Sequence, residues 1–168
     1  FNQSWYPGDS VNMSIGQGFL LVTPQQVHNM LCLIVNDGCY YKPYYVERIV
    51  SPSGEIMEQF EPEIVKEIDV AKDTFRIIKE GMRRVVESGT GYLANIEEMK
   101  IAGKTGTAQN PQGENHAWFI GFAPFEHPEV CITVFIEHGG DGSATAAPIA
   151  GNIIRKYFQL KYLQIVKG

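Results

Sequence analysis

Three strand-like runs joined by short polar connections constrain this sequence more than any other feature. The runs cover residues 100–109, 116–124 and 130–138. A crossover between parallel strands needs about a dozen residues or more, so the connections at 110–115 and 125–129 favour antiparallel neighbours. The C-terminal half of the chain therefore predicts a three-stranded antiparallel sheet.

Capping and periodicity signals predict two helices before this sheet. Thr23-Pro24 begins the first helix, with a capping-box glutamine three residues after the threonine, and Gly38 ends it. The second helix covers about residues 70–87 and has Asp69 as its cap. The predicted apolar faces carry Val27, Met30, Leu31, Ile34 and Val35 in the first helix, and Phe75, Ile78, Met82, Val85 and Val86 in the second.

Turn and strand signals complete the expected order of elements. Trp5–Asp9 is typical of a turn, and Tyr44–Val50 followed by Ser51–Gly54 predicts a strand and hairpin. A last helix follows Gly139–Gly142 and extends to about Lys161. Its predicted buried stripe is Ile149, Ile153, Tyr157 and Leu160. This order predicts an α+β fold in which N- and C-terminal helices cover an antiparallel sheet.

Composition excludes several classes of protein. With 168 residues, 44% of them apolar and 20% charged, the chain can form a packed core and is not disordered. The 19 acidic residues outnumber the 14 Lys and Arg, which argues against nucleic acid as a partner. The longest apolar run, Met30–Val35, is far short of the roughly 18 residues of a membrane span.

The three cysteines and the histidines predict no metal site. Cys32, Cys39 and Cys131 match neither a CxxC motif nor a zinc ribbon. Cys32 and Cys131 lie in apolar runs, which favours buried thiols that pack as small hydrophobic groups. The remaining candidates, His28, His127 and His138, share no ligand spacing with the cysteines.

Gly103–Thr107, with the sequence GKTGT, is the segment that most clearly indicates chemistry. Glycine weakens a strand but lets a ligand backbone approach closely. Thr105 and Thr107 lie on one face of a strand, so both hydroxyls could hold one carboxylate beside the charge of Lys104. The simpler alternative for Lys104 is a strand lysine with a solvated tip. A nucleotide-binding loop, GxxxxGK[ST], would need glycine where the chain has Glu98.

Lys104–Thr107 resembles the KTG(T) motif of penicillin-binding proteins, the serine DD-transpeptidases of peptidoglycan synthesis. Three more segments match this family in order: Gly16–Gln25 (GQGFLLVTPQ), Glu80–Gly91 (EGMRRVVESGTG) and His116–Pro124 (HAWFIGFAP). The similarity covers nearly the whole chain and is greatest to class B proteins of the elongation type, the penicillin-binding protein 2 group. It implies a partial transpeptidase (β-lactamase-like) fold.

The resemblance implies a serine acyl-enzyme and assigns roles around residues 104–107. Lys104 would add positive potential and help proton transfer, and the backbone N–H of Thr107 would form half of the oxyanion hole. The hydroxyls of Thr105 and Thr107 would bind the terminal carboxylate of a stem peptide or a β-lactam, and Gly106 would leave room for a ligand along the strand edge. No cofactor is implied.

The nucleophile expected by the family is missing from this sequence. None of the seven serines, Ser4, Ser10, Ser14, Ser51, Ser53, Ser88 and Ser143, has a lysine three residues later, so the chain has no SxxK. Ser10-Val11-Asn12 spells SxN at a position where the family has a variable turn, and we interpret it as a chance match. Residues 1–168 are therefore expected to be the C-terminal portion of one transpeptidase domain, inactive and poorly folded without an upstream half.

Two further functions remain open from the sequence, together with the roles of several aromatic residues. A penicillin-sensing or inactive scaffold domain, or a serine β-lactamase, would share KTG.

Trp118 and Phe119 are expected in the core, and His116 either hydrogen-bonds at the start of its strand or borders the cleft. The resemblance implies a periplasmic domain anchored to the inner membrane, with glycosyltransferase and scaffold partners of the elongation machinery.

Overall fold

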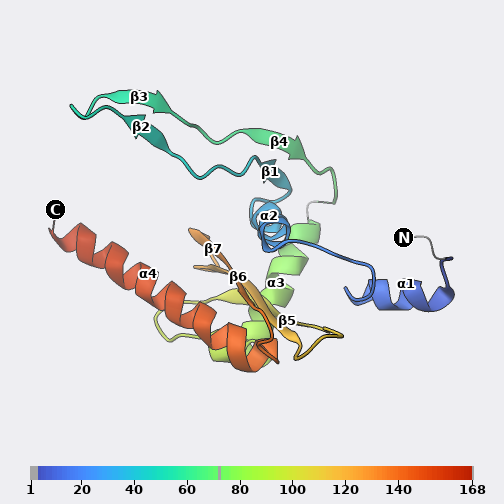
Figure 1. Ribbon diagram of the computed structural model, residues 1–168. Coiled ribbons are helices and arrows are strands. Elements are labelled where there is room, and N and C mark those ends of the chain that lie inside the picture. The colour runs from blue at the N-terminus through green and yellow to red at the C-terminus, as the bar shows by residue number, and fades with distance from the viewer. Residues whose placement is uncertain (1–3, 72, 168) are drawn as a thin grey trace.

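A three-stranded antiparallel sheet with the order β5-β6-β7 forms the centre of the protein, and helices lie on both of its faces (Figure 1). The computed structural model describes residues 4–71 and 73–167. The helices are α1 (Pro7–Ser14), α2 (Pro24–Val35), α3 (Asp73–Ser88), the 3-10 turn η1 (Tyr92–Ala94), the π-helical turn η2 (Gly142–Ala146) and α4 (Ala147–Lys167). The strands are β1 (Cys39–Tyr41), β2 (Arg48–Val50), β3 (Ile56–Gln59), β4 (Ile64–Glu67), β5 (Ala102–Ala108), β6 (His116–Ala123) and β7 (Val130–Ile136).

The alternation of side chains along β6 divides the core between the two faces of the sheet. Phe119 and Phe122 are both fully buried, but they point to opposite faces. Phe119 belongs to a cluster with Val86 and residues of α4, whereas Phe122 packs with Leu31 of α2 and Met82 of α3. The predicted α+β class and the antiparallel order of the three strands are therefore confirmed.

Both helices that were predicted before the sheet are present, and one of them has a different boundary. In α2, the Thr23 hydroxyl accepts from the backbone N–H of Gln26 at 3.2 Å, which is the predicted cap. Gly38 has the positive φ of +96° that ends such a helix. The prediction for α3 was wrong at its start. β4 ends at Glu67, residues 68–71 form neither helix nor strand, and the helix begins at Asp73; residue 72 lies outside the described residues.

The segment predicted as a turn at residues 5–9 instead begins helix α1. Pro7 occupies its first turn, and the carboxylate of Asp9 accepts from the backbone N–H of Tyr6 at 2.8 Å. These are helix-start signals, because proline fits the first position and an acidic side chain satisfies free N–H groups there.

The predicted buried stripe of α4 was wrong by one residue. Ile149, Ile153, Tyr157 and Leu160 are 37–51% exposed. The buried side is formed by Ala147, Ala150, Gly151, Ile154 and Phe158. Its small residues let the helix approach η1 closely: a Cβ on Gly151 would lie 2.8 Å from the carbonyl oxygen of Ala94.

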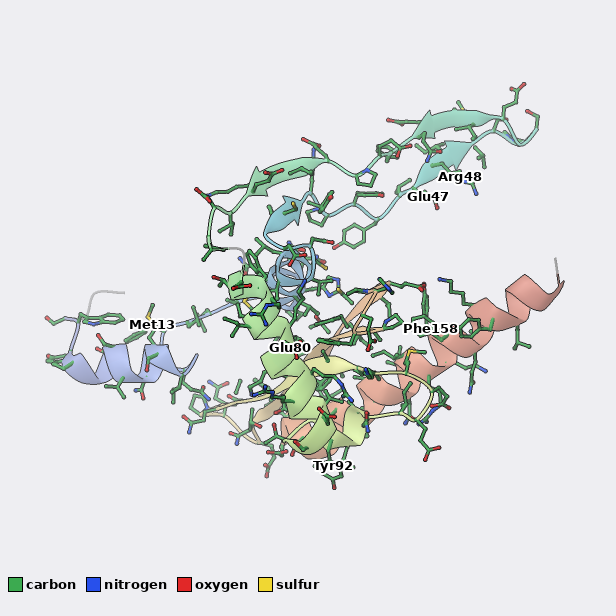
Figure 2. The ribbon with its side chains drawn as sticks, turned by 180° about the vertical axis from the view of Figure 1, so that it is seen from behind. Met13, Glu47, Arg48, Glu80, Tyr92 and Phe158 are labelled. Carbon is green, nitrogen blue, oxygen red and sulfur yellow. The ribbon has the colours of Figure 1, made fainter. Side chains whose placement is uncertain are left out.

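The hairpin predicted after residue 44 extends from the body as a long arm (Figures 1 and 2). β2 pairs with β3 around the turn at Ser51–Gly54, and β1 pairs with β4 closer to α2. The predicted strand Tyr44–Val50 is shorter than expected, since β2 begins at Arg48. Every residue of β2, β3 and β4 is exposed, so the arm has no core of its own. Within the described chain, no helix has the length and hydropathy of a membrane span.

Candidate active site

The second half of β5 presents an open edge. β5 is the outer strand of its sheet, and on the side away from β6 the side-chain amide of Gln17 bonds to its backbone. Gln17 Nε2 donates to the carbonyl of Thr107 at 3.1 Å, and the N–H of Gln109 donates to Gln17 Oε1 at 3.3 Å. Because the N–H and C=O of one strand residue point to the same side, the N–H of Thr107 also faces this edge.

A groove of about 850 Å³ runs beside this edge. Its floor contains residues 104–108 of β5, and its opposite wall is residues 15–18 and 20–22 with Val27 and Met30 of α2. Lys104 is the single Lys or Arg among the described residues that line it, and none of them is Asp or Glu. A groove with apolar walls and one cation suits an extended ligand that carries a carboxylate.

The ammonium group of Lys104 lies beside the outer edge of β5. The side chain is exposed, and Nζ donates to the backbone carbonyl of Thr105 at 2.6 Å, which holds the ammonium group close to the strand. Lys104 therefore combines the solvated tip of the simpler alternative with a position in the groove lining.

The two threonine hydroxyls point to one side of β5 and already have partners. Thr105 is 9% exposed, and its hydroxyl lies 2.7 Å from that of Thr90, just after α3. The Thr107 hydroxyl accepts from the N–H of Gly142 at 3.2 Å and donates to Asp141 Oδ2 at 3.4 Å. The sequence interpretation missed Thr90 and Asp141. An aspartate before a helical segment is a capping signal that could have pointed to Asp141.

Asp141 joins the start of η2 to β5. Its Oδ1 accepts from the hydroxyl and N–H of Ser143 and from the N–H of Ala144. These bonds, with the Ser143 hydroxyl first, hold the pKa of the Asp141 carboxyl below its usual value. The position is tight, because a Cβ on Gly142 would lie 2.2 Å from the carbonyl oxygen of Gly106.

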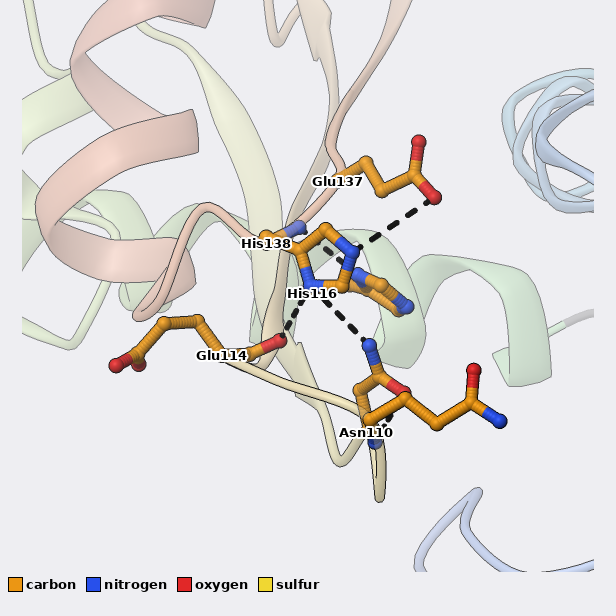
Figure 3. Close-up of polar contacts among 6 residues, drawn as sticks. Asn110, Glu114, His116, Glu137 and His138 are labelled. Carbon is orange, nitrogen blue, oxygen red and sulfur yellow. Dashed lines mark hydrogen bonds and ion pairs between the residues drawn. The ribbon is translucent and has the colours of Figure 1, made fainter.

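His116 and His138 form a hydrogen-bonded pair at the start of β6 (Figure 3). Nδ1 of His116, the first residue of β6, accepts from the backbone N–H of His138 at 3.0 Å. The His138 ring in turn lies 3.2 Å from the side-chain amide of Asn110 and from the Glu114 carbonyl. His116 and Asn110 both line the groove. Both roles considered for His116, hydrogen bonding at the strand start and bordering the cleft, are therefore present together.

The remaining sequence candidates divide between groove and core. Phe119 is buried as predicted, but Trp118 was wrongly assigned to the core: it lines the groove, with its ring 4.4 Å from that of Phe135. Ser10 and Asn12 lie on α1, outside the groove lining. No Ser or Cys is found among the described residues of that lining, and no three described His, Cys, Asp or Glu side chains could share a metal ion.

Comparison with known families shows which family this chain belongs to. The family model described as the penicillin-binding protein transpeptidase domain matches residues 1–155. The chain belongs to this family. Among curated transpeptidases, the peptidoglycan D,D-transpeptidase MrdA of Haemophilus influenzae is 32% identical over 187 residues, which cover 99% of this chain and 28% of that protein. The chain thus spans less than a third of the length of this relative.

Solved structures of other transpeptidase-family proteins share the fold. Penicillin-binding protein PBP2 of Pseudomonas aeruginosa, in complex with WCK 5153, superposes with a TM-score of 0.76 at 31% identity, covering 92% of this chain and 33% of that one. The penicillin G acyl-enzyme complex of penicillin-binding protein A from M. tuberculosis gives 0.76 at 29% identity, with 88% and 34% covered. The expected partial transpeptidase fold is therefore confirmed.

Proposed function

We propose that this chain is the substrate-binding part of a peptidoglycan DD-transpeptidase that cross-links stem peptides through a serine acyl-enzyme and is acylated by β-lactams. The observation that carries the proposal is the open edge of β5, with a groove and a single cation beside it. A stem peptide or β-lactam has an extended amide backbone and a terminal carboxylate, which match these features. MrdA of Haemophilus influenzae is a peptidoglycan D,D-transpeptidase, and penicillin-binding protein A of M. tuberculosis forms a penicillin G acyl-enzyme, which supports this proposal.

The edge of β5 supplies an oxyanion donor, a positive charge and room for the acyl donor. The N–H of Thr107 faces the groove and is the donor we assign to the oxyanion that forms when the carbonyl is attacked. One preorganised donor of this kind is worth about 3 kcal/mol in the transition state. Lys104 contributes positive potential and eases proton transfer at the serine, and Gly106 gives the acyl donor room to pair along the strand.

The threonine hydroxyls are assigned to the carboxylate of the donor. A threonine hydroxyl has one proton to donate, and in Thr107 that proton is directed at Asp141. Binding of a carboxylate therefore requires the Thr107 hydroxyl to turn toward the ligand, while the Gly142 N–H still bonds to its oxygen. In the pair of Thr105 with Thr90 either hydroxyl can be the donor, so Thr105 can give its proton to the ligand while it accepts from Thr90.

The nucleophilic serine and its lysine base are assigned to an upstream half of the same polypeptide, since this sequence holds no SxxK. That half completes a single transpeptidase domain with residues 1–168. The relatives are peptidoglycan enzymes, which supports an activity outside the cytoplasm. An inner-membrane anchor, a glycosyltransferase and a scaffold protein of the elongation machinery are the further partners that we propose.

Labelling with fluorescent penicillin tests this function in the polypeptide that carries this chain together with its upstream half. We expect covalent labelling of the wild type and a loss of at least about tenfold in acylation rate for Lys104→Ala, the scale of one charge-assisted interaction. Lys100→Ala is the matched control, since Lys100 pairs with Glu126 outside the groove. Unlabelled wild type would refute the function, and undiminished labelling of Lys104→Ala would remove Lys104 from the mechanism.

A further inference from the structure

A second cavity lies between α2 and the start of β7 and shares no residue with the groove. Its volume is about 340 Å³. Cys32 of α2 and Cys131 of β7 both line it, with His28 one helical turn before Cys32. The remaining lining residues are Val35, Asn36, Pro128, Glu129 and Val130. The two thiols are therefore half-buried in the wall of an accessible cavity, not sealed in the core as their apolar surroundings in the sequence suggested.

Local geometry brings these side chains together from positions 99 apart in the sequence. His28 and Cys32 are four residues apart on α2 and so lie on one face of the helix. Along β7, Ile132 and Val134 point into the cluster under α4, which turns Cys131 and Thr133 toward α2. His28 Nδ1 lies 3.0 Å from the Thr133 hydroxyl and fixes the helix against the strand.

The two thiols lie in the wall of one cavity, Cys32 on α2 and Cys131 on β7. Hydrogen bonding from the Cys131 thiol and from His28, in that order of effect, lowers the pKa of Cys32. The pKa of Cys131 is raised because its thiol keeps its proton in this bond and is partly buried. Cys32 is thus the better nucleophile of the pair, and Cys131 is the neighbouring thiol that can resolve an intermediate on it.

We propose that Cys32 and Cys131 form an intramolecular disulfide that joins α2 to β7. The oxidant is a small-molecule or protein disulfide. The Cys32 thiolate attacks one of its sulfurs, forming a mixed disulfide and releasing one thiolate. Cys131 then loses its proton and attacks the Cys32 sulfur, releasing the second thiolate. The two cysteines lose two protons and two electrons, and the oxidant is reduced to two thiols.

The crosslink has a defined structural consequence. It closes a loop that contains the hairpin arm, α3, β5 and β6, and constraining so long a loop reduces the entropy of the unfolded chain. It also fixes α2, whose preceding segment forms one wall of the groove, against the sheet. The bond does not depend on acyl transfer and stands apart from the proposed function.

The purified polypeptide that carries this chain is equilibrated in buffers of oxidised and reduced glutathione, quenched with acid and alkylated with N-ethylmaleimide. Cys39 is the internal reference. Cleavage before Asp37 separates Cys32 from Cys39, so non-reducing mass spectrometry identifies each partner. We expect Cys32 linked to Cys131 with the loss of two hydrogen atoms, and Cys39 alkylated. The Cys39→Ser variant should form the same crosslink.

Unfolding by denaturant gives the second measurement. The oxidised protein should unfold at a higher denaturant concentration than the reduced one, and Cys131→Ser should abolish this difference. The proposal is overturned if Cys32 and Cys131 are both alkylated in oxidised glutathione, if they carry only mixed disulfides, or if Cys39 is crosslinked as often as Cys131.

Discussion

Gln17 occupies the hydrogen-bonding positions of β5 that an extended ligand would need. Its side-chain amide donates to the Thr107 carbonyl and accepts from the Gln109 N–H, as the peptide group of an added strand would. A stem peptide that pairs with this edge must displace Gln17. Gln17 is thus part of the groove wall and also competes with a ligand for the backbone hydrogen bonds of β5.

Replacing Gln17 by alanine should therefore speed acylation of the polypeptide that includes the upstream half. The substitution removes two competing hydrogen bonds, and a net gain on the scale of one of them corresponds to about a two- to tenfold increase in the second-order rate with penicillin. Gln25→Ala is the control, since Gln25 bonds to Asn29 and Tyr45 and does not line the groove. A slower reaction in Gln17→Ala would show that this amide positions the ligand instead of competing with it.

Asp141 gives a prediction for stability. Asp141→Ala removes the acceptor of three hydrogen bonds at the start of η2 and should cost about 1 kcal/mol, whereas Asp141→Asn keeps a cap and should cost a few tenths. The pKa of Asp141 is lower in the folded than in the unfolded protein, so the ionised carboxylate stabilises the fold. This stabilisation is fully present above the pKa of the unfolded state and is lost as the pH falls through the pKa of the folded state. Urea unfolding between neutral and acid pH should show this loss in wild type and a smaller one in Asp141→Asn. Equal pH dependence in both would contradict the assignment.

At the scale of elements, α4 has apolar residues on two adjoining sides, and only one of these sides is buried in the core. Ile153 and Ile154 are neighbours of the same type, but Ile153 is 51% exposed and Ile154 is 1% exposed. The choice follows from the close approach that Ala147, Ala150 and Gly151 allow. Larger side chains on that side would hold α4 away from Phe119 and η1.

The pair of isoleucines tests this packing. Ile154→Ala should lower the free energy of unfolding by about 2–5 kcal/mol, because it leaves a cavity in the cluster under α4. Ile153→Ala should change it by about 0.5 kcal/mol or less, as expected for an exposed site. Thermal or denaturant unfolding of both variants measures the difference. Equal losses would mean that the exposed side of α4 is also covered.

At the scale of the whole molecule, the chain exposes more surface than a compact protein of its mass. The accessible area is 11586 Å², whereas a compact protein of 18.8 kDa exposes about 8,300 Å². α1 buries no residue, the hairpin arm has no core, and α4 exposes Ile149, Ile153 and Leu160. Apolar surface of this extent is typical of a piece that needs a partner.

We therefore expect the 168-residue chain alone to self-associate and to bind a hydrophobic dye, and the polypeptide with its upstream half to do neither. Sedimentation velocity and dye fluorescence at matched concentrations compare the two. In the longer polypeptide, Ile153→Ala should also become more destabilising, because the exposed side of α4 is then covered. A monomeric chain that melts in one sharp transition by itself would refute this expectation.

Local rules in the sequence determined the antiparallel sheet, the cap at Thr23 and the side of β5 shared by Thr105 and Thr107, because connection length, capping and the period of a strand depend on neighbouring residues. The tertiary structure alone decided which side of α4 is buried, since both sides have helical spacing and only the fit of small residues against η1 distinguishes them. It also decided the contacts of Gln17 with β5 and the placement of Cys32 and Cys131 in the wall of one cavity. These contacts join positions about a hundred residues apart, and no periodicity connects them.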